Sequence, residues 1–361
     1  MKRFLVFLVL VAGGLAAAAL VVPTNAAVVN GQSISQDQLN SDLTAIANSK
    51  CYQGYLTSVA QGQGGLPPID GAGQSSGEAP HTTSTSAFAA SYLDLAIQNQ
   101  IVLQVAAQHH VSVTSQEINS ASTGLKNQIS EALSSSGGTP GCSATTGDQV
   151  LATMPSSFVQ STERFGAVLA TFERQLSGVG SSDNDLKTFF DEHRSVFDNV
   201  CFTAAFYTSG NDAEAAKAAI YEGATFSSLA AKTNGGGPQG CIILYGLVAA
   251  VSSTTDLQNL PLNTVSVPIA ISNGQYVLLE FTSRTPSSFT TAKASVQQAA
   301  LSIGQGRART LIGSAIVHAH VTVDPRYGAW NPTSAQLQLF APPTANDVLN
   351  PSANSPSGQS G

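Results

Sequence analysis

The sequence contains few charged residues. Only 10% of its 361 residues are charged, with 15 Lys and Arg against 22 Asp and Glu, whereas charged residues make up about a quarter of a typical globular domain. Ala, Ser, Gly, Thr, Asn and Gln must therefore form most of the surface. The acidic balance argues against a polyanionic partner such as nucleic acid.

The sequence also lacks the common catalytic and metal-binding motifs. It has no G-x-S-x-G, P-loop or H-E-x-x-H pattern, so the enzyme classes that depend on them are not indicated. It has no C-x-x-C and no Cys-His cluster. The pair His318 and His320 would place two imidazoles on one face of a strand, but no third ligand is evident. We therefore expect neither a metal nor a cofactor.

Residues 1–26 have the pattern of a secretory signal peptide. Lys2 and Arg3 precede an apolar run over residues 4–22, and the small residues Thr24 and Ala26 follow. This pattern predicts export and cleavage after Ala26, hence an extracytoplasmic location, secreted or associated with the cell envelope. An uncleaved membrane tether is the alternative, because about 19 apolar residues can just span a bilayer. No Cys lies near the cleavage site to carry a lipid anchor.

Apolar residues at helical spacing predict four long helices, over residues 91–109, 158–176, 185–197 and 289–316. Ser35, Thr114 and Ser182 are expected N-caps, because an acidic or amide side chain follows each of them three residues later. Three other stretches are rich in Gly, Ser, Thr, Asn or Pro and predict irregular structure. They are two flexible loops, 61–86 and 134–146, and a disordered tail, 331–361.

The segment Val200–Pro286 resembles the parvulin-type peptidyl-prolyl isomerase domain. The resemblance lies in the order of its motifs: an apolar strand (200–207), a helix (212–220), the short helix around Phe226 and Leu229, a Gly-rich turn (235–241), Val265-Ser266-Val267-Pro268-Ile269 and a last strand (277–281). It implies an antiparallel sheet flanked by helices over residues 198–287.

The catalytic side chains of that family are not kept. Parvulins resemble one another in a His on the first strand, a Cys or Asp after the second helix, a His on the last strand and a Met/Phe pair around the proline ring. In this chain the first-strand position falls at Thr203 or Ala204, and the position after the second helix falls at Thr233 or Asn234. The last-strand position falls at Tyr276, and the Met/Phe pair aligns with Val248 and Ser252. Thr203, Asn234 and Tyr276 are therefore the candidate catalytic residues, offering a hydroxyl, an amide and a phenol.

A second resemblance covers most of the remaining chain. Four segments resemble parts of the SurA/PrsA-type extracytoplasmic chaperones. Residues 28–39 resemble the start of these proteins, and 95–114 resemble their central helix pair. Residues 185–193 resemble the helix before the isomerase domain, and 321–328 resemble the end of these proteins. The last of these segments, 321–328, is most similar to actinobacterial members of the family. The resemblance implies an α+β fold: a mostly helical chaperone domain from residues 27–197 and 288–330, with the parvulin-like domain inserted. It also implies that Val28–Asn30 and Val321–Val323 are neighbouring strands.

Four cysteines in an exported chain favour disulfides, but they allow three connectivities, and the sequence alone does not choose between them. The pairing Cys51–Cys142 with Cys201–Cys241 is preferred because each bond would then lie within one proposed domain. A reactive thiol is the alternative.

The resemblances together imply an exported chaperone or foldase that binds unfolded or newly translocated polypeptides. Two alternatives remain open: an active parvulin-type prolyl isomerase, and a non-catalytic, surface-anchored interaction protein. The oligomeric state is not predicted.

Overall fold

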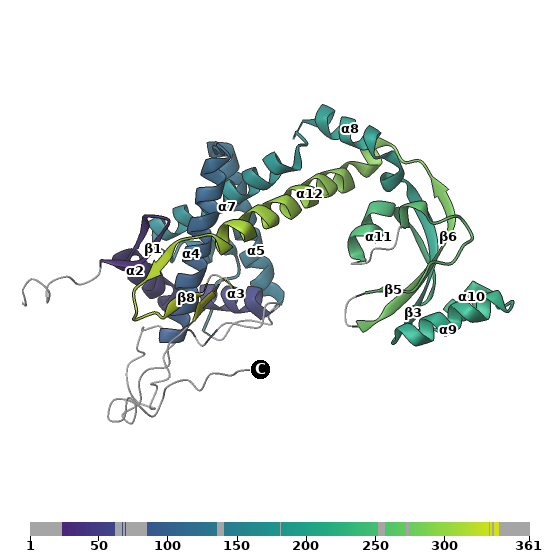
Figure 1. Cartoon of the computed structure of the whole chain (residues 1–361), viewed down its shortest axis with the longest axis horizontal. Helices are drawn as coiled ribbons and strands as arrows, with labels where there is room; N and C mark the ends of the chain where they lie inside the picture. Colours follow the sequence, from purple (N-terminus) through teal and green to yellow (C-terminus); the bar gives the residue numbers. More distant parts are fainter. Residues whose placement is uncertain are drawn as a thin grey trace, which may run out of the picture. The chain divides into compact units, whose positions relative to one another are not determined.

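The computed structural model has an α+β fold with two compact units (Figure 1). It describes residues 24–61, 67, 69, 85–135, 141–180, 182–251, 257–271, 274–331, 333 and 336–338. Unit 1 comprises residues 1–172 and 309–361, and unit 2 comprises Glu173–Ala308. The divisions fall inside helices α7 (Ser156–Ser177) and α12 (Phe289–Val317). The domain boundaries at 197/198 and 287/288 stay a prediction.

Unit 1 is mostly helical and includes a small antiparallel sheet of strand order β2–β1–β7. Val28 of β1 (Asn25–Val29) lies opposite Thr322 of β7 (Val321–Val323), which confirms that these two segments are neighbouring strands. The other elements of this unit are β2 (Gln32–Ser35), α2 (Gln36–Asn48), α3 (Lys50–Gln61), α4 (Ser86–Gln108), α5 (Ser115–Ser135), α6 (Gly147–Leu151), β8 (Ala329–Asn331) and β9 (Gln336–Gln338).

Asn30 joins the two chain ends at this sheet. Its backbone N–H donates to the carbonyl of His320 (2.8 Å), and its Oδ1 accepts from the N–H of His320 (2.8 Å). Its Nδ2 donates to Gln104 of α4 (2.7 Å). The residue has a φ of +49°, a left-handed conformation that Asn tolerates better than most side chains. One side chain therefore links β1, the segment before β7 and the long buried helix α4.

Asp324, directly after β7, is a buried carboxylate held by Arg326. Nη2 of Arg326 donates to Oδ2 (2.6 Å), and the backbone N–H of Arg326 donates to Oδ1 (3.0 Å). The hydrogen bonds from the guanidinium hold the pKa of Asp324 below its usual range.

This pKa predicts a pH dependence of stability. Because the folded pKa lies below the unfolded one, the contact stabilises the fold above the unfolded pKa and is lost as the pH falls through the folded pKa. We expect Asp324→Asn to cost stability near pH 7 and to cost progressively less toward about pH 2. Urea unfolding of the wild type and of Asp324→Asn across this pH range measures the difference in their free energies of unfolding. A difference that does not change with pH would contradict the prediction.

Unit 2 contains a four-stranded antiparallel sheet of order β4–β3–β6–β5, with β3 (Asn199–Tyr207) and β6 (Tyr276–Thr285) in the centre. Its other elements are α8 (Asp183–Glu192), the 3₁₀ turn η1 (Arg194–Phe197), α9 (Gly210–Tyr221), α10 (Phe226–Ala230), β4 (Gly237–Ile243), α11 (Leu244–Ala250), the 3₁₀ turn η2 (Leu257–Asn259), β5 (Ile269–Ala270) and α12.

The three predicted N-caps are confirmed. Ser35 Oγ accepts from the N–H of Gln38 (3.1 Å), Ser182 and Asp185 form a full capping box, and Thr114 shares reciprocal bonds with Glu117. The helix predicted over 185–197 is wrong in its last turn, because α8 ends at Glu192 and η1 follows. The tighter turn lets Phe197 pack beside Phe190, with ring centroids 5.7 Å apart.

The predicted tail is structured at its start. Residues 329–331 and 336–338 pair as the hairpin β8–β9, and the N–H of Leu337 donates to Asp94 of α4 (2.8 Å). For residues 331 and 336–338 the prediction of disorder is wrong, because the hairpin has a hydrogen-bond partner on α4. Apart from Thr333, the remainder of the tail lies outside the described residues, as do most of the predicted loop 61–86 and residues 136–140 of the loop 134–146. The loop prediction is wrong for residues 134–135, which belong to α5.

The predicted signal peptide lies outside the described residues as far as residue 23. Ala26 is fully buried in β1, and its carbonyl accepts from the N–H of Asp324 (2.9 Å). Cleavage after Ala26 would therefore remove the first two residues of β1, and the cleavage site stays a prediction. None of the helices that the structure describes has the length and apolar character needed to cross a membrane.

Candidate functional site

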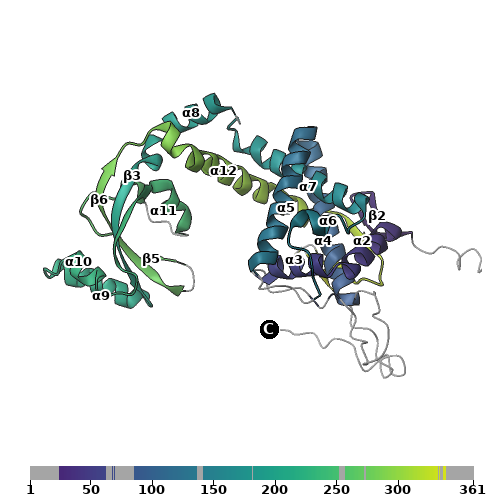
Figure 2. The same ribbon diagram turned by 180° about the vertical axis from the view of Figure 1, so that it is seen from behind.

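The sheet of unit 2 has two apolar faces with different cover. α9 and α10 cover one of them, called here the helix-covered face, through Ala213, Phe226 and Ala230. The short helix α11 packs on the opposite one, called here the apolar face, through Leu244 and Leu247. Figure 2 shows α11 on one side of the sheet and α9 and α10 on the other. The sheet residues of the apolar face are Val200, Phe202, Ala204, Ile269, Val277, Leu279 and Phe281.

The predicted catalytic positions on the two central strands lie on the helix-covered face. Side chains alternate along a strand, so Thr203, which follows Phe202 and precedes Ala204, shares its face with Ala205. Thr203 is only 5% exposed. The ring of Tyr276 packs against Gly210 at the start of α9, where an added Cβ would lie 3.2 Å from it. Tyr276 therefore serves the packing of α9 onto the sheet, and Thr203 is buried on the same face.

The positions after the second helix are also accounted for. Thr233 Oγ1 accepts from the backbone N–H of Phe206 (3.2 Å) and donates to the carbonyl of Ala230 (2.9 Å), so it joins α10 to β3. Asn234 is exposed. Of the two proline-pocket positions, Val248 is 38% exposed on α11, and Ser252 lies outside the described residues.

The segment offers little acid–base chemistry. Residues 198–287 contain no His, and the described residues hold no group of three or more His, Cys, Asp or Glu that could bind a metal. The hydroxyl of Tyr207 is buried without a hydrogen-bond partner among the described residues, and burial raises its pKa.

All four cysteines form disulfides. Cys51 pairs with Cys142 and Cys201 pairs with Cys241, which confirms the preferred connectivity. The Cys201–Cys241 bond joins directly opposite residues of β3 and β4. The reactive-thiol alternative is therefore wrong. Two disulfides in one chain indicate an oxidising compartment.

The apolar face is incompletely covered at its rim. Five side chains pack against it and keep partial exposure: Phe206, Leu247, Val251, Leu260 and Ile271. In the same segment of the chain, Val248 of α11 and the loop residues Leu262 and Val267 are 38%, 46% and 49% exposed. From Thr233 to Leu279 the only charged residue is Asp256. Depletion of charge around exposed apolar side chains is typical of an interaction surface.

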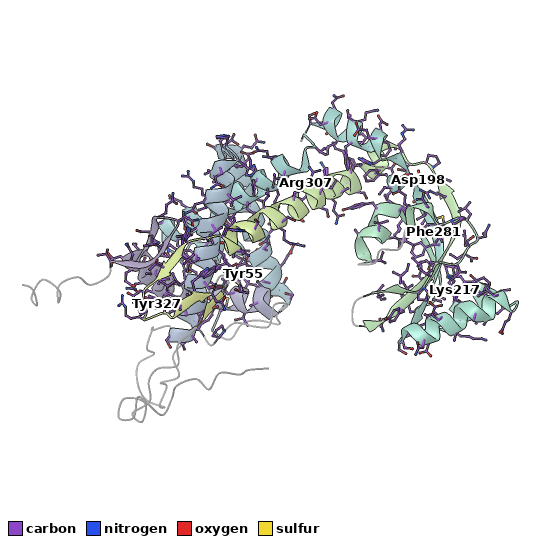
Figure 3. The ribbon with its side chains drawn as sticks, viewed as in Figure 1. Tyr55, Asp198, Lys217, Phe281, Arg307 and Tyr327 are labelled. Carbon is purple, nitrogen blue, oxygen red and sulfur yellow. A yellow bond between two sulfur atoms is a disulfide. The ribbon has the colours of Figure 1, made fainter. Side chains whose placement is uncertain are left out.

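Sequence reasoning missed the side chain that holds this sheet to the preceding turn. Arg284 of β6 donates to Asp198 Oδ2 (2.7 Å), to the carbonyl of Gln258 (2.6 Å) and to that of Ser195 (2.6 Å). Figure 3 labels Asp198 above Phe281. A single Arg on a strand gives no sequence signal of such a role, since its three partners come from η1, η2 and the loop before β3.

Neither a family model nor a curated protein matches the sequence. Among solved structures, the chain is similar to the peptidylprolyl isomerase PrsA of Bacillus anthracis, at 15% identity over 62% of this chain and 95% of that one, with a TM-score of 0.35. It is similar to the foldase PrsA of Streptococcus pneumoniae, at 16% identity over 65% and 88%, with a TM-score of 0.31. A chain from a study of the SurA-like chaperones PEB4 and Cj1289 of Campylobacter jejuni matches at 12% identity over 83% and 99%, with a TM-score of 0.26. The similar structures are thus PrsA and SurA-like foldases and chaperones at low identity.

Proposed function

We propose that this chain is an exported chaperone that holds unfolded or newly translocated polypeptides by apolar contact, and that it does not catalyse prolyl isomerisation. One observation carries the proposal: the apolar face has a partly exposed, nearly charge-free rim, while Thr203 and Tyr276 lie on the helix-covered face. Translocated chains expose apolar segments before they pack, and a neutral apolar surface can cover such segments without chemistry.

The absence of catalysis follows from what isomerisation requires. The twisted amide of the transition state needs polar groups placed around the proline. The residues at the corresponding positions are an exposed Asn234, a Thr203 that is 5% exposed and a Tyr276 that packs on α9. We infer that Thr203 and Tyr276, which lie on the face covered by α9 and α10, are not placed to surround a proline of a client.

Suppression of aggregation tests the chaperone role. An unfolded, aggregation-prone polypeptide is diluted from denaturant at a stoichiometric ratio to the purified protein, and light scattering is followed. We expect the wild-type protein to reduce scattering, and unchanged scattering would contradict the role.

A matched pair of variants tests where the client binds. The first variant combines Val248→Ser, Leu262→Ser and Val267→Ser. We expect it to weaken client affinity about tenfold or more, because burial of even one such side chain contributes about 1.5 kcal/mol. Tyr221→Ser is the control: Tyr221 is 83% exposed at the end of α9, which packs on the other face. Equal affinity in both variants would place the client elsewhere.

A further inference from the structure

The Cys201–Cys241 disulfide lies in an edge strand, β4, that pairs with β3 alone, at residues 237, 238 and 241–243. β4 lies at the edge of the sheet, and its residues 238–242 are all exposed. Pro238 has no N–H to donate to β3, and the pairing register is interrupted between Cys201 and Thr203. The disulfide is thus the covalent attachment of a strand that buries little surface of its own.

β4 leads directly into the helix that covers the apolar face. α11 begins at Leu244, immediately after Ile243. Leu244 is fully buried against Val200 and Phe281, and its N–H donates to the carbonyl of Asp198 (2.9 Å). α11 has only seven residues, and a helix of that length is unstable without tertiary contacts. Its position therefore depends on this packing and on the strand that anchors its first turn.

We propose that the Cys201–Cys241 bond is a redox latch on the apolar face. With the bond closed, β4 keeps α11 on the sheet, and clients reach only the rim. With the bond reduced, β4 and α11 separate from the sheet more often, exposing Phe202, Leu279 and Phe281 to a client. The latch regulates the surface of the proposed function and rests on that function for its client.

The chemistry is thiol–disulfide exchange with a dithiol reductant. Cys241 is exposed, whereas Cys201 is half-buried, so a thiolate of the reductant attacks Cys241 Sγ and releases the thiolate of Cys201. The second thiolate of the reductant then attacks the mixed disulfide and releases Cys241. Two electrons pass to the protein sulfur atoms, which take up two protons, and the reductant leaves as a disulfide.

Amide hydrogen exchange tests the latch in Cys201→Ser/Cys241→Ser. We expect residues 237–251 to exchange at least about tenfold faster than in the wild type, while β6 stays protected. Fluorescence of anilinonaphthalene sulfonate and affinity for a labelled, cysteine-free unfolded polypeptide should both rise. The control is Cys51→Ser/Cys142→Ser, which removes the disulfide of unit 1 and should leave exchange of residues 237–251 unchanged.

A second measurement covers the case in which the first variant does not fold. Cys51→Ser/Cys142→Ser is purified in its oxidised form and then treated with dithiothreitol, which can reduce only Cys201–Cys241. Faster exchange in 237–251 with increased dye binding supports the latch. Unchanged exchange, or faster exchange without increased dye binding, overturns it. If exchange and dye binding rise but neither redox form binds the client, the latch stands and the proposed chaperone function fails.

Discussion

Replacing Gly304 with Val is expected to destabilise unit 2 by about 3 kcal/mol or more. Gly304 lies in α12 where this helix crosses the end of α7. A Cβ built at this position would lie 1.9 Å from the carbonyl oxygen of Glu173 and 3.3 Å from the backbone N of Ser177. Because the clash is with backbone, no rotamer change relieves it, and the two helices must move apart.

Separating the helices also removes a cap from α7. Nη1 of Arg307, labelled in Figure 3, donates to the carbonyl of Leu176 (2.7 Å) at the end of that helix. Urea unfolding followed by circular dichroism measures the loss. Gly306→Ala is the matched control, because a Cβ there meets no atom within 4 Å, and Ala in a helix interior is more stable than Gly by about 0.5–1 kcal/mol. A midpoint for Gly304→Val equal to that of the wild type would contradict the close crossing.

Replacing Arg284 with Ala is expected to cost about 2–4 kcal/mol. The Arg284 side chain is 21% exposed and that of Asp198 is 16% exposed. Removing the guanidinium leaves a largely buried carboxylate unpaired and the carbonyls of Ser195 and Gln258 without this donor. The cost is below that of a fully buried pair, because water still reaches part of both side chains.

Lys187→Ala provides the comparison for Arg284. Lys187 also pairs with an aspartate, Asp191 (2.6 Å), but its side chain is 56% exposed and the pair lies on one helix surface. Such an exposed pair contributes little to stability, because water screens both charges. Equal losses in the two variants would mean that Arg284 does not act as a buried junction between η1, η2 and β6.

Features that depend on neighbouring residues in the chain could be predicted from the sequence. Ser182 and Asp185 lie three residues apart, so their capping box is a local event. The pairing of β1 with β7 and the two disulfides span long separations, and only resemblance and domain grouping indicated them. The resemblance of the motif order to parvulins implied an antiparallel sheet, but it gave neither the number of strands nor the faces of Thr203 and Tyr276.

What the sequence could not provide depends on contacts between distant segments. Gly304 looks like any helix glycine until the carbonyl of Glu173 is placed beside it. The break between α8 and η1 depends on Phe197 reaching the cluster of Phe190 and Val296. The segment that contains β9 is rich in polar residues, a composition that predicts disorder. Its ordering depends on a hydrogen bond from the N–H of Leu337 to Asp94, which lies on a helix 243 residues earlier.

The most direct test of the central claim is the cis–trans exchange rate of a proline peptide, measured by NMR with and without the protein. Uncatalysed exchange takes tens to hundreds of seconds at 25 °C. With apolar contact and no catalytic centre, the rate should stay at this background for the wild type, Tyr276→Phe and Asn234→Ala alike. An acceleration by the wild type that is lost in either variant would contradict the account.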